Sequence, residues 1–452
     1  METLEPGMLL AVDPVGGMVI NADTEFNAGT FVIDSKITIA ADDITISGAG
    51  QGATILMTDA SDTTGFNMFQ IFGWNNVVLS DFTIDGNQEA IGDFFGVESF
   101  SMLGLDINGS SNIDLNNFTA RNFGGAGAFY SGAGGSGHDV TNSTFSGNSM
   151  LDPGGAFDHA NLFFQGQSNL LIDNVTVEDT PLYTGLLIQG GDMVTINDST
   201  ITNSGWNGIT STATRTTVTN NMIDRSGVKE QFTGSAIEVD SQVPGLEFTV
   251  ISGNTITNSN YTAISAVGEI VTIHDNFIDG TAVQGILPNF PNTSGAIYVQ
   301  DFGNQFSIDH TITDNTILNA GWMGIFYNDV SSSSLEDGSV ISGNTITNPF
   351  NEGMRIESTL PADSDLLRVL DNTITGSGSH GIFFANFGGG GYLVKGNTID
   401  NTGAGAIEAH NKTGMQIIDN TISNAGSGNG VFLYSGSALF GDKSVIEANT
   451  LT

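Results

Sequence analysis

The sequence predicts an all-β protein built as a three-sided parallel β-helix, and two observations support this fold class. One is a repeated phrase: ISGNTITN occurs at residues 251–258 and again at 341–348, and near-copies such as VTIHDNFIDG and LRVLDNTITG lie between and beyond them. The other is the regular spacing of the apolar residues on either side of each copy. A phrase repeated along a chain indicates one structural unit stacked on itself.

Each copy of the phrase holds a tight turn between two short strands. The apolar residues that bracket the turn are five positions apart, as in Ile251 with Ile256 and Ile417 with Ile422. Apolar alternation over three residues has the period of a strand rather than that of a helix. Asn stands two places before the second apolar residue at Asn221, Asn254, Asn276, Asn315, Asn344, Asn372, Asn397, Asn420 and Asn449.

The repeated Asn has a structural reason. Asn tolerates the left-handed backbone conformation, and its side-chain amide can bond to the copy one coil away. A column of such amides would satisfy buried polar groups along the stack. We therefore expect an internal ladder that includes Asn315, Asn344, Asn372, Asn397 and Asn420.

A second fixed interval leads to the third strand of each coil. It is eight residues long, as from Ile256 to Ile264, and Gly precedes the apolar residue in most copies. The third interval varies, from nine residues between Ile264 and Ile273 to sixteen between Ile325 and Ile341. Successive turn Asn residues are mostly 22 to 29 positions apart, which is the length of one coil of a three-sided parallel β-helix. The chain is long enough for about fifteen such coils.

The charge balance limits the partners of the protein. The chain has 49 acidic and 10 basic residues and a formal net charge of -39. Such a surface repels nucleic acid and anionic membranes, so we expect no nucleic-acid partner. It favours bound cations, and calcium is the candidate cofactor outside a cell. The alternative is that the charge only keeps a long protein soluble.

Other features concern the location of the protein. The chain has no cysteine, and no apolar stretch has the length of a membrane span, so we expect neither disulfides nor membrane insertion. The start, LEPGMLLAVDP, resembles the LEPR-XLL motif near the start of large bacterial surface and secreted proteins, with Gly7 in place of the Arg. This resemblance implies an extracellular or cell-surface location of bacterial type. Because the last coil, SVIEANTLT, offers no polar cap, we also expect the chain to belong to a larger surface protein or assembly.

The repeats resemble the right-handed parallel β-helix (pectate-lyase-like) superfamily over residues 30–452. The stretch from residue 46 to 88, ISGAGQGATILMTDASDTTGFNMFQIFGWNNVVLSDFTIDGNQ, is similar to the entry coils of its polysaccharide-modifying members, with mannuronan C5-epimerase modules nearest. The resemblance implies a single-stranded right-handed parallel β-helix with Asn-containing turns. Residues 1–29 would form a tail and a cap. It also implies that the strand after the eight-residue turn lines a saccharide groove.

Outward side chains on that strand are the candidates for substrate contact. Residues one and three places after each inward apolar residue point outward, and this set is rich in aromatic and charged side chains that suit sugars. Together with His380, which lies beside this strand, we predict the following substrate-binding residues: Tyr298, Gln300, Phe326, Asn328, Arg355, Glu357, His380, Phe383, Phe432 and Tyr434. The alternative is that large loops cover these aromatics as a satellite core.

Glu408 and His410 are the predicted catalytic pair. They are two positions apart in GAIEAHN, so both face the groove, and a carboxylate beside a His can share acid–base work at a sugar carbon. The stretch resembles the YGFDPHE motif of mannuronan epimerases, with Glu408 at its Asp and His410 at its His. The Tyr of the motif falls on Gly405, and the partner Asp one coil later falls on Asn429.

A second candidate lies in GGAFDHANLFFQ. Asp158 and His159 stand where a turn enters the groove strand, with Gln165 on that strand and Tyr183 one coil later. Adjacent residues on a strand point to opposite sides, so the alternative is a capped turn.

Two classes of function follow from these patterns. The first is an extracellular protein that binds or modifies a polysaccharide, in an epimerase- or lyase-like manner. The second is a structural or adhesive surface rod without catalysis, because one fold serves both classes. Lyases of this fold need a basic residue near an anionic sugar, and ten basic residues make that hard to arrange without calcium. The sequence identifies no metal ligands.

Overall fold

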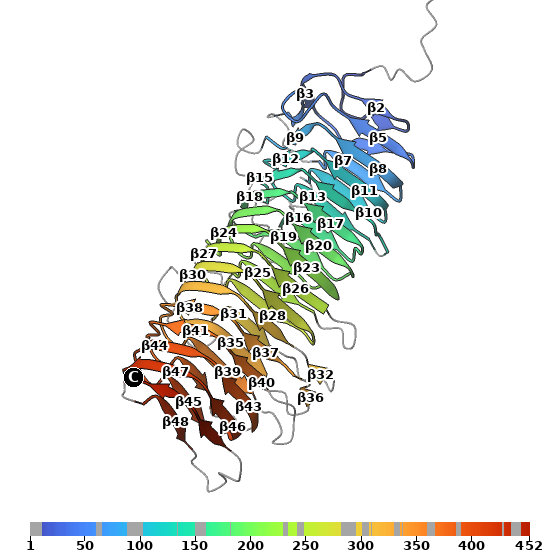
Figure 1. The fold of residues 1–452 in the computed structure, drawn as a ribbon. Coiled ribbons are helices and arrows are strands. Elements are labelled where there is room, and N and C mark those ends of the chain that lie inside the picture. The colour runs from blue at the N-terminus through green and yellow to red at the C-terminus, as the bar shows by residue number, and fades with distance from the viewer. Residues whose placement is uncertain are drawn as a thin grey trace, which may run out of the picture. The chain divides into compact units, whose positions relative to one another are not determined.

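The computed structural model describes residues 11–59, 66–87, 103–132, 134–149, 160–180, 182–228, 234–241, 248–281, 295–300, 307–308, 310–329, 335–336, 338–358, 367–385, 390–426, 429–434 and 444–452. Every regular element in these ranges is a β-strand. The strands form three parallel sheets of sixteen strands each, and the chain enters the first, second and third sheet in turn (Figure 1). The predicted fold class, an all-β parallel β-helix, is confirmed, with about sixteen coils.

The chain divides into two compact units, residues 1–213 with 228–232 and residues 214–227 with 233–452. In the first unit, the first sheet contains β1 (Val19–Ile20), β4 (Ile37–Ile39), β7 (Phe69–Phe72), β10 (Leu105–Asn108), β13 (Ala128–Ser131), β16 (Ala160–Gln165), β19 (Thr184–Gln189) and β22 (Ile209–Ser211). The second sheet contains β2 (Thr24–Glu25), β5 (Ile44–Ser47), β8 (Asn75–Ser80), β11 (Ser111–Asn116), β14 (Asp139–Thr141), β17 (Leu170–Asp173) and β20 (Val194–Asn197). The third contains β3 (Gly29–Ile33), β6 (Thr54–Thr58), β9 (Thr83–Asp85), β12 (Thr119–Arg121), β15 (Thr144–Ser146), β18 (Thr176–Thr180) and β21 (Thr200–Ser204).

The second unit repeats this plan. Its first sheet contains β25 (Ile237–Asp240), β28 (Ile264–Val267), β31 (Gly295–Gln300), β35 (Met323–Asp329), β39 (Met354–Ser358), β42 (Ile382–Phe384), β45 (Ile407–His410) and β48 (Val431–Tyr434). Its second sheet contains β23 (Arg215–Thr219), β26 (Phe248–Ser252), β29 (Val271–His274), β33 (Thr311–Thr313), β37 (Val340–Ser342), β40 (Leu367–Leu370), β43 (Gly390–Lys395), β46 (Thr413–Ile418) and β49 (Val445–Glu447). Its third contains β24 (Met222–Ser226), β27 (Thr255–Ser259), β30 (Phe277–Thr281), β34 (Thr316–Ala320), β38 (Thr345–Thr347), β41 (Thr373–Thr375), β44 (Thr398–Thr402), β47 (Thr421–Ala425) and β50 (Thr450–Leu451). A small separate pair consists of β32 (Ser307–Ile308) and β36 (Leu335–Glu336).

The apolar pairs identified from the sequence form the core. Ile251 is the register partner of Ile273, which pairs in turn with Ile312, and all three side chains are fully buried. Burial of such columns along the three sheets supplies the main apolar driving force for stacking the coils.

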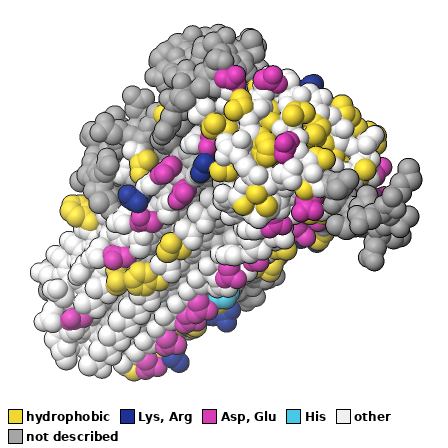
Figure 2. Space-filling view, turned by 90° about the horizontal axis from the view of Figure 1, so that it is seen from above, with side chains coloured by type: hydrophobic (Ala, Val, Ile, Leu, Met, Phe, Trp, Pro, Cys, Tyr) yellow, Lys and Arg dark blue, Asp and Glu magenta, His cyan; other side chains and the backbone are white. Residues whose placement is uncertain are grey.

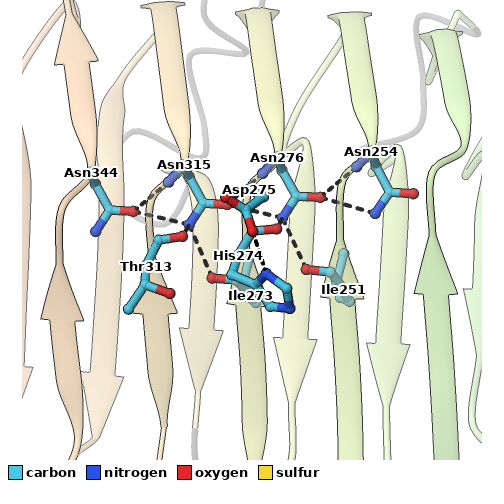
Figure 3. Close-up of polar contacts among 9 residues, drawn as sticks. All are labelled: Ile251, Asn254, Ile273, His274, Asp275, Asn276, Thr313, Asn315 and Asn344. Carbon is cyan, nitrogen blue, oxygen red and sulfur yellow. Dashed lines mark hydrogen bonds and ion pairs between the residues drawn. The ribbon is translucent and has the colours of Figure 1, made fainter.

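The predicted Asn ladder is confirmed in the second unit. Asn276 donates from its backbone N (3.1 Å) and from its side-chain Nδ2 (2.9 Å) to Oδ1 of Asn315 in the next coil. Its Nδ2 also donates to the backbone oxygen of Ile251 at 2.9 Å, as Figure 3 shows. Equivalent bonds run from Asn221 through Asn254, Asn276, Asn315, Asn344, Asn372, Asn397 and Asn420 to Asn449. The ladder therefore fixes the register of nine successive turns.

The first unit fills the same turn position differently. Phe82 and Phe118 occupy it in two successive coils, with their rings edge to face and centroids 5.1 Å apart. In the coil after Phe118 the position is Ser143, whose Oγ accepts from the backbone N of Phe118 at 3.2 Å. A hydroxyl can thus replace the acceptor of the Asn amide, while a Phe replaces it with apolar packing.

Two further expectations concern the start and the surface of the chain. Residues 1–10, which hold most of the LEPR-XLL-like stretch, lie outside the described residues, and the cap at residues 1–29 stays a prediction. Acidic side chains outnumber basic ones over the face drawn in Figure 2, consistent with the net charge of -39.

Candidate active site

The predicted site residues lie in the second unit, on or next to the outer side of its first sheet. On each strand, one residue directly follows the inward apolar residue. These residues are register partners on successive strands, in the order Tyr298, Phe326, Arg355, Phe383, Glu408, Phe432. Those three places after the inward apolar residue include Gln300, Asn328 and Glu357 on successive strands, and His410 paired with Tyr434 further along. The structure therefore brings them together as two neighbouring columns.

Glycines at the start of these strands add further side chains to this face. A Cβ at Gly353 would lie 2.4 Å from Cγ2 of Ile374, and one at Gly381 would lie 2.5 Å from Cγ2 of Ile399, so both positions face the packed core. The residue before each Gly consequently turns outward, which brings Glu352 and His380 to the face. His380 was among the predicted residues, but simple alternation does not predict Glu352, and the Gly before the apolar residue is the sequence signal that could have found it.

The centre of the site is one carboxylate between two imidazoles. Oε1 of Glu408 lies 2.6 Å from Nε2 of His410, and Oε2 lies 2.9 Å from Nε2 of His380 in the preceding coil. The three side chains are partly exposed, at 17% for Glu408, 28% for His410 and 18% for His380. We call them the His–Glu–His cluster. A ligand on this face can therefore reach all three.

The bonds of the cluster determine how its protons are arranged. A neutral imidazole that donates from Nε2 to a carboxylate carries its lone pair on Nδ1. In His380, Nδ1 lies 3.0 Å from Oγ of Ser379, which can donate to it. For His410, none of the described residues bonds to Nδ1. In the neutral tautomer that donates from Nε2, Nδ1 of His410 is therefore the nitrogen that a ligand can use as an acceptor.

Phe383 contacts both imidazoles of the cluster. Its ring stacks on His380, with centroids 5.0 Å apart at 21°, and meets the ring of His410 edge-on at 5.4 Å. The guanidinium of Arg355 lies 5.4 Å from the same ring on the preceding strand, within the range of a cation–π contact. These contacts limit the rotation of both imidazoles.

Arg355 is already paired with carboxylates of the protein. Its Nε and one terminal nitrogen lie 2.7 and 2.5 Å from Oε1 of Glu357, and its other terminal nitrogen lies 3.7 Å from Oε1 of Glu352. Oε2 of Glu352 is buried and bonds to none of the described residues. With three carboxylates against one guanidinium, the face is formally negative unless the imidazoles are protonated.

The start of the face is more closed than the sequence predicted. Phe326 is only 2% exposed, between the ring of Tyr298 (centroids 5.2 Å apart) and Arg355, so it offers no open ring to a sugar. The hydroxyl of Tyr298 donates to Oε1 of Gln300 at 2.5 Å, and burial raises the pKa of this phenol. Phe326 is therefore covered, as the alternative of a satellite core states for these aromatics.

The other end of the face is open. Phe432 is 39% exposed and Tyr434 48% exposed, and the Tyr434 ring lies 5.4 Å from that of His410. Exposed rings beside a polar cluster suit the combination of stacking and hydrogen bonding by which proteins bind sugars.

The remaining site predictions have mixed outcomes. Among the described residues, no group of three His, Asp or Glu side chains is arranged to hold a metal ion, and calcium stays a prediction. Asp158 and His159 lie outside the described residues, so only Gln165, at the end of β16, and Tyr183 of the second candidate are placed. In the described part of the chain, nothing forms an apolar helix long enough to cross a membrane.

The fold and this face define a parallel β-helix with a polar and aromatic site along one sheet. The chain belongs to the right-handed β-helix family: residues 160–301 and 295–452 match the family described as "Right handed beta helix region". No curated protein matches the chain.

Solved structures share the fold at low sequence identity. The N-terminal fragment of bacteriophage Phi29 gene product 12 is similar over 94% of this chain and 67% of its own, with 12% identity and a TM-score of 0.56. The catalytic domain of a GH87 alpha-1,3-glucanase in complex with nigerose is similar over 99% of this chain and 70% of its own, with 14% identity and a TM-score of 0.46. The A-module of the Azotobacter vinelandii mannuronan C-5 epimerase AlgE6 is similar over 96% of this chain and 91% of its own, with 11% identity and a TM-score of 0.28. At these identities the likeness concerns the fold and assigns no activity.

Proposed function

We propose that this protein binds a polysaccharide along the outer face of the first sheet in its second unit and modifies it by acid–base chemistry at Glu408 and His410. One observation carries the proposal: both oxygens of a partly exposed carboxylate bond to imidazoles. Polymers of this kind are found outside cells, so the proposal includes an extracellular or cell-surface location.

The cluster gives each residue a role. Nδ1 of His410 accepts a proton from a water molecule as that water attacks the glycosidic carbon, the bond to the leaving sugar breaks, and the proton returns to the leaving sugar oxygen. Glu408 stabilises the intervening imidazolium through its 2.6 Å bond to Nε2. His380, bonded to the other oxygen of Glu408, is a positioning residue. A carboxylate held between two partners cannot rotate freely, which keeps the base aligned for the transition state.

The charges on the face favour an uncharged sugar. Epimerase- or lyase-like chemistry on a uronate needs a cation beside the sugar carboxylate. Arg355 is the nearest guanidinium, but Glu357 and Glu352 already compensate its charge. A polyuronate would meet an excess of carboxylates here, whereas a neutral glycan would not. We therefore expect neutral glycans to bind more tightly than polyuronates.

A structural role without catalysis is the second candidate. The burial of Phe326 and the internal pairing of Arg355 favour it, because both side chains then serve the packing of the protein itself. This candidate predicts that no glycan binds to the face.

Binding of neutral and uronate oligosaccharides by calorimetry tests the proposal. Replacing Phe383 by Ala removes the ring that both imidazoles contact, and we expect the affinity for the bound glycan to fall about tenfold. Phe248→Ala is the matched control, since Phe248 is an exposed Phe on β26 of the second sheet. Equal affinities of the two variants, or no binding by the unmodified protein, would refute the proposal.

A further inference from the structure

A pair of stacked aromatic rings stands on the turns that lead into β35 and β39. The rings of Trp322 and Phe350 lie 5.7 Å apart at 27°, and Phe350 is 59% exposed. We propose that this pair is a second sugar-binding subsite, a platform on which one ring of the polysaccharide stacks at a distance from the His–Glu–His cluster. The inference rests on the proposed function and extends it to a substrate several sugars long.

The backbone connects the platform directly to the cluster. The amide of Asn351 donates to the carbonyl of Trp322 at 2.8 Å, and the amide of Ser379 donates to that of Asn351 at 3.0 Å. Ser379 then contacts His380 through its Oγ. Trp322 and Ser379 are therefore two coils apart in one column of turns, which is roughly 10 Å at the spacing of neighbouring strands. That separation exceeds a single sugar ring and suits a short oligosaccharide.

Among the described residues, little on the surface between the two sites obstructs a sugar chain. The positions that follow Phe350 in the next two coils are Gly378 and Gly403. A Cβ at Gly378 would lie 2.0 Å from the carbonyl oxygen of Phe350, and one at Gly403 would lie 2.1 Å from that of Gly378. Side chains are excluded at both positions. In these two coils the exposed surface of the turn next to the Trp322–Phe350 pair is therefore formed by backbone.

The exposure of Phe350 separates this ring from the core, and Trp322 is half-buried beside it. A Phe with more than half of its surface in water contributes little to the packing of the coils. The flat apolar faces of the rings match the C–H faces of a pyranose, as aromatic side chains do in carbohydrate recognition. Because the pair lies away from the cluster, it would position a long substrate without taking part in the chemistry.

Chain-length dependence of binding tests the subsite. For Trp322→Ala and Phe350→Ala we expect the affinity for a hexasaccharide to fall about five- to tenfold and the affinity for a disaccharide to stay unchanged. Trp206→Ala is the matched control, because Trp206 stands three places before Ile209 in the first unit, as Trp322 stands three places before Ile325.

The outcomes separate this inference from the proposed function. A hexasaccharide that binds equally to Trp322→Ala, Phe350→Ala and Trp206→Ala would overturn the platform and leave the proposed function standing. If the unmodified protein binds neither oligosaccharide, both fail. Thermal melting of each variant checks that the turns remain folded.

Discussion

Replacing Asn372 by Ala is expected to lower the free energy of unfolding of the second unit by about 3 kcal/mol. Asn372 is fully buried, and its Oδ1 accepts from the backbone N and from Nδ2 of Asn344, at 3.0 and 2.9 Å. The substitution leaves a buried backbone amide without an acceptor and removes the donor to the carbonyl of Ile341. Each buried polar group left unpaired costs about 1–3 kcal/mol.

The last rung provides the control for this prediction. Asn449 accepts the same two bonds from Asn420, but it is half-buried, so water can replace the lost acceptor. Urea unfolding should show a clearly smaller loss for Asn449→Ala than for Asn372→Ala. Hydrogen exchange should also show loss of protection at the amide of Asn344. Equal losses of unfolding free energy in both variants would mean that the buried hydrogen bonds of the ladder stabilise the fold no more than exposed ones do.

The largest effect on activity is expected from Glu408→Gln. An amide has one acceptor oxygen and one donor nitrogen, so it cannot accept from Nε2 of both His380 and His410 as the carboxylate does. It also cannot stabilise an imidazolium by charge. We expect turnover of the bound glycan to fall about 10²- to 10⁴-fold, the usual contribution of acid–base catalysis, and His410→Ala to cause a similar loss.

Binding should respond much less than turnover in these variants. The proton transfer is stabilised mainly in the transition state, so the affinity for the glycan should change by less than about threefold. Glu357→Gln is the matched control, since Glu357 contacts Arg355 and neither imidazole. A loss of turnover as large for Glu357→Gln as for Glu408→Gln would show that charge on the face, and not the cluster, supports the reaction.

Most of the fold could be predicted from the sequence, because it depends on local repeats. The five-residue spacing of pairs such as Ile251 and Ile256 fixes the second and third strands of each coil, and the Asn between them fixes the turn. The prediction of the turns was incomplete in the first unit, where side chains other than Asn occupy the ladder position. Phe82 and Ser143 occupy the ladder position of the first unit, and no repeated Asn marks them.

The site was only partly predictable, because alternation along a strand says nothing of neighbouring coils. It correctly put Glu408 and His410 on one face, but it did not predict that His380 bonds to the second oxygen of Glu408. The sequence also left open whether Phe326 is covered, since coverage depends on contacts across coils. Trp322 was likewise not identified, because nothing in the sequence pairs it with the ring one coil away.

The most direct test of the polysaccharide site is an NMR titration of the histidine ring nitrogens with the glycan that binds most tightly. The chain has six His residues, and two of them, His380 and His410, form the cluster. We expect the ring resonances of these two to shift in a saturable manner. Those of His138, which is buried in the first unit and bonded to Gln167, should stay unchanged. Saturable binding that moves neither His380 nor His410 would contradict the assignment of this face as the site.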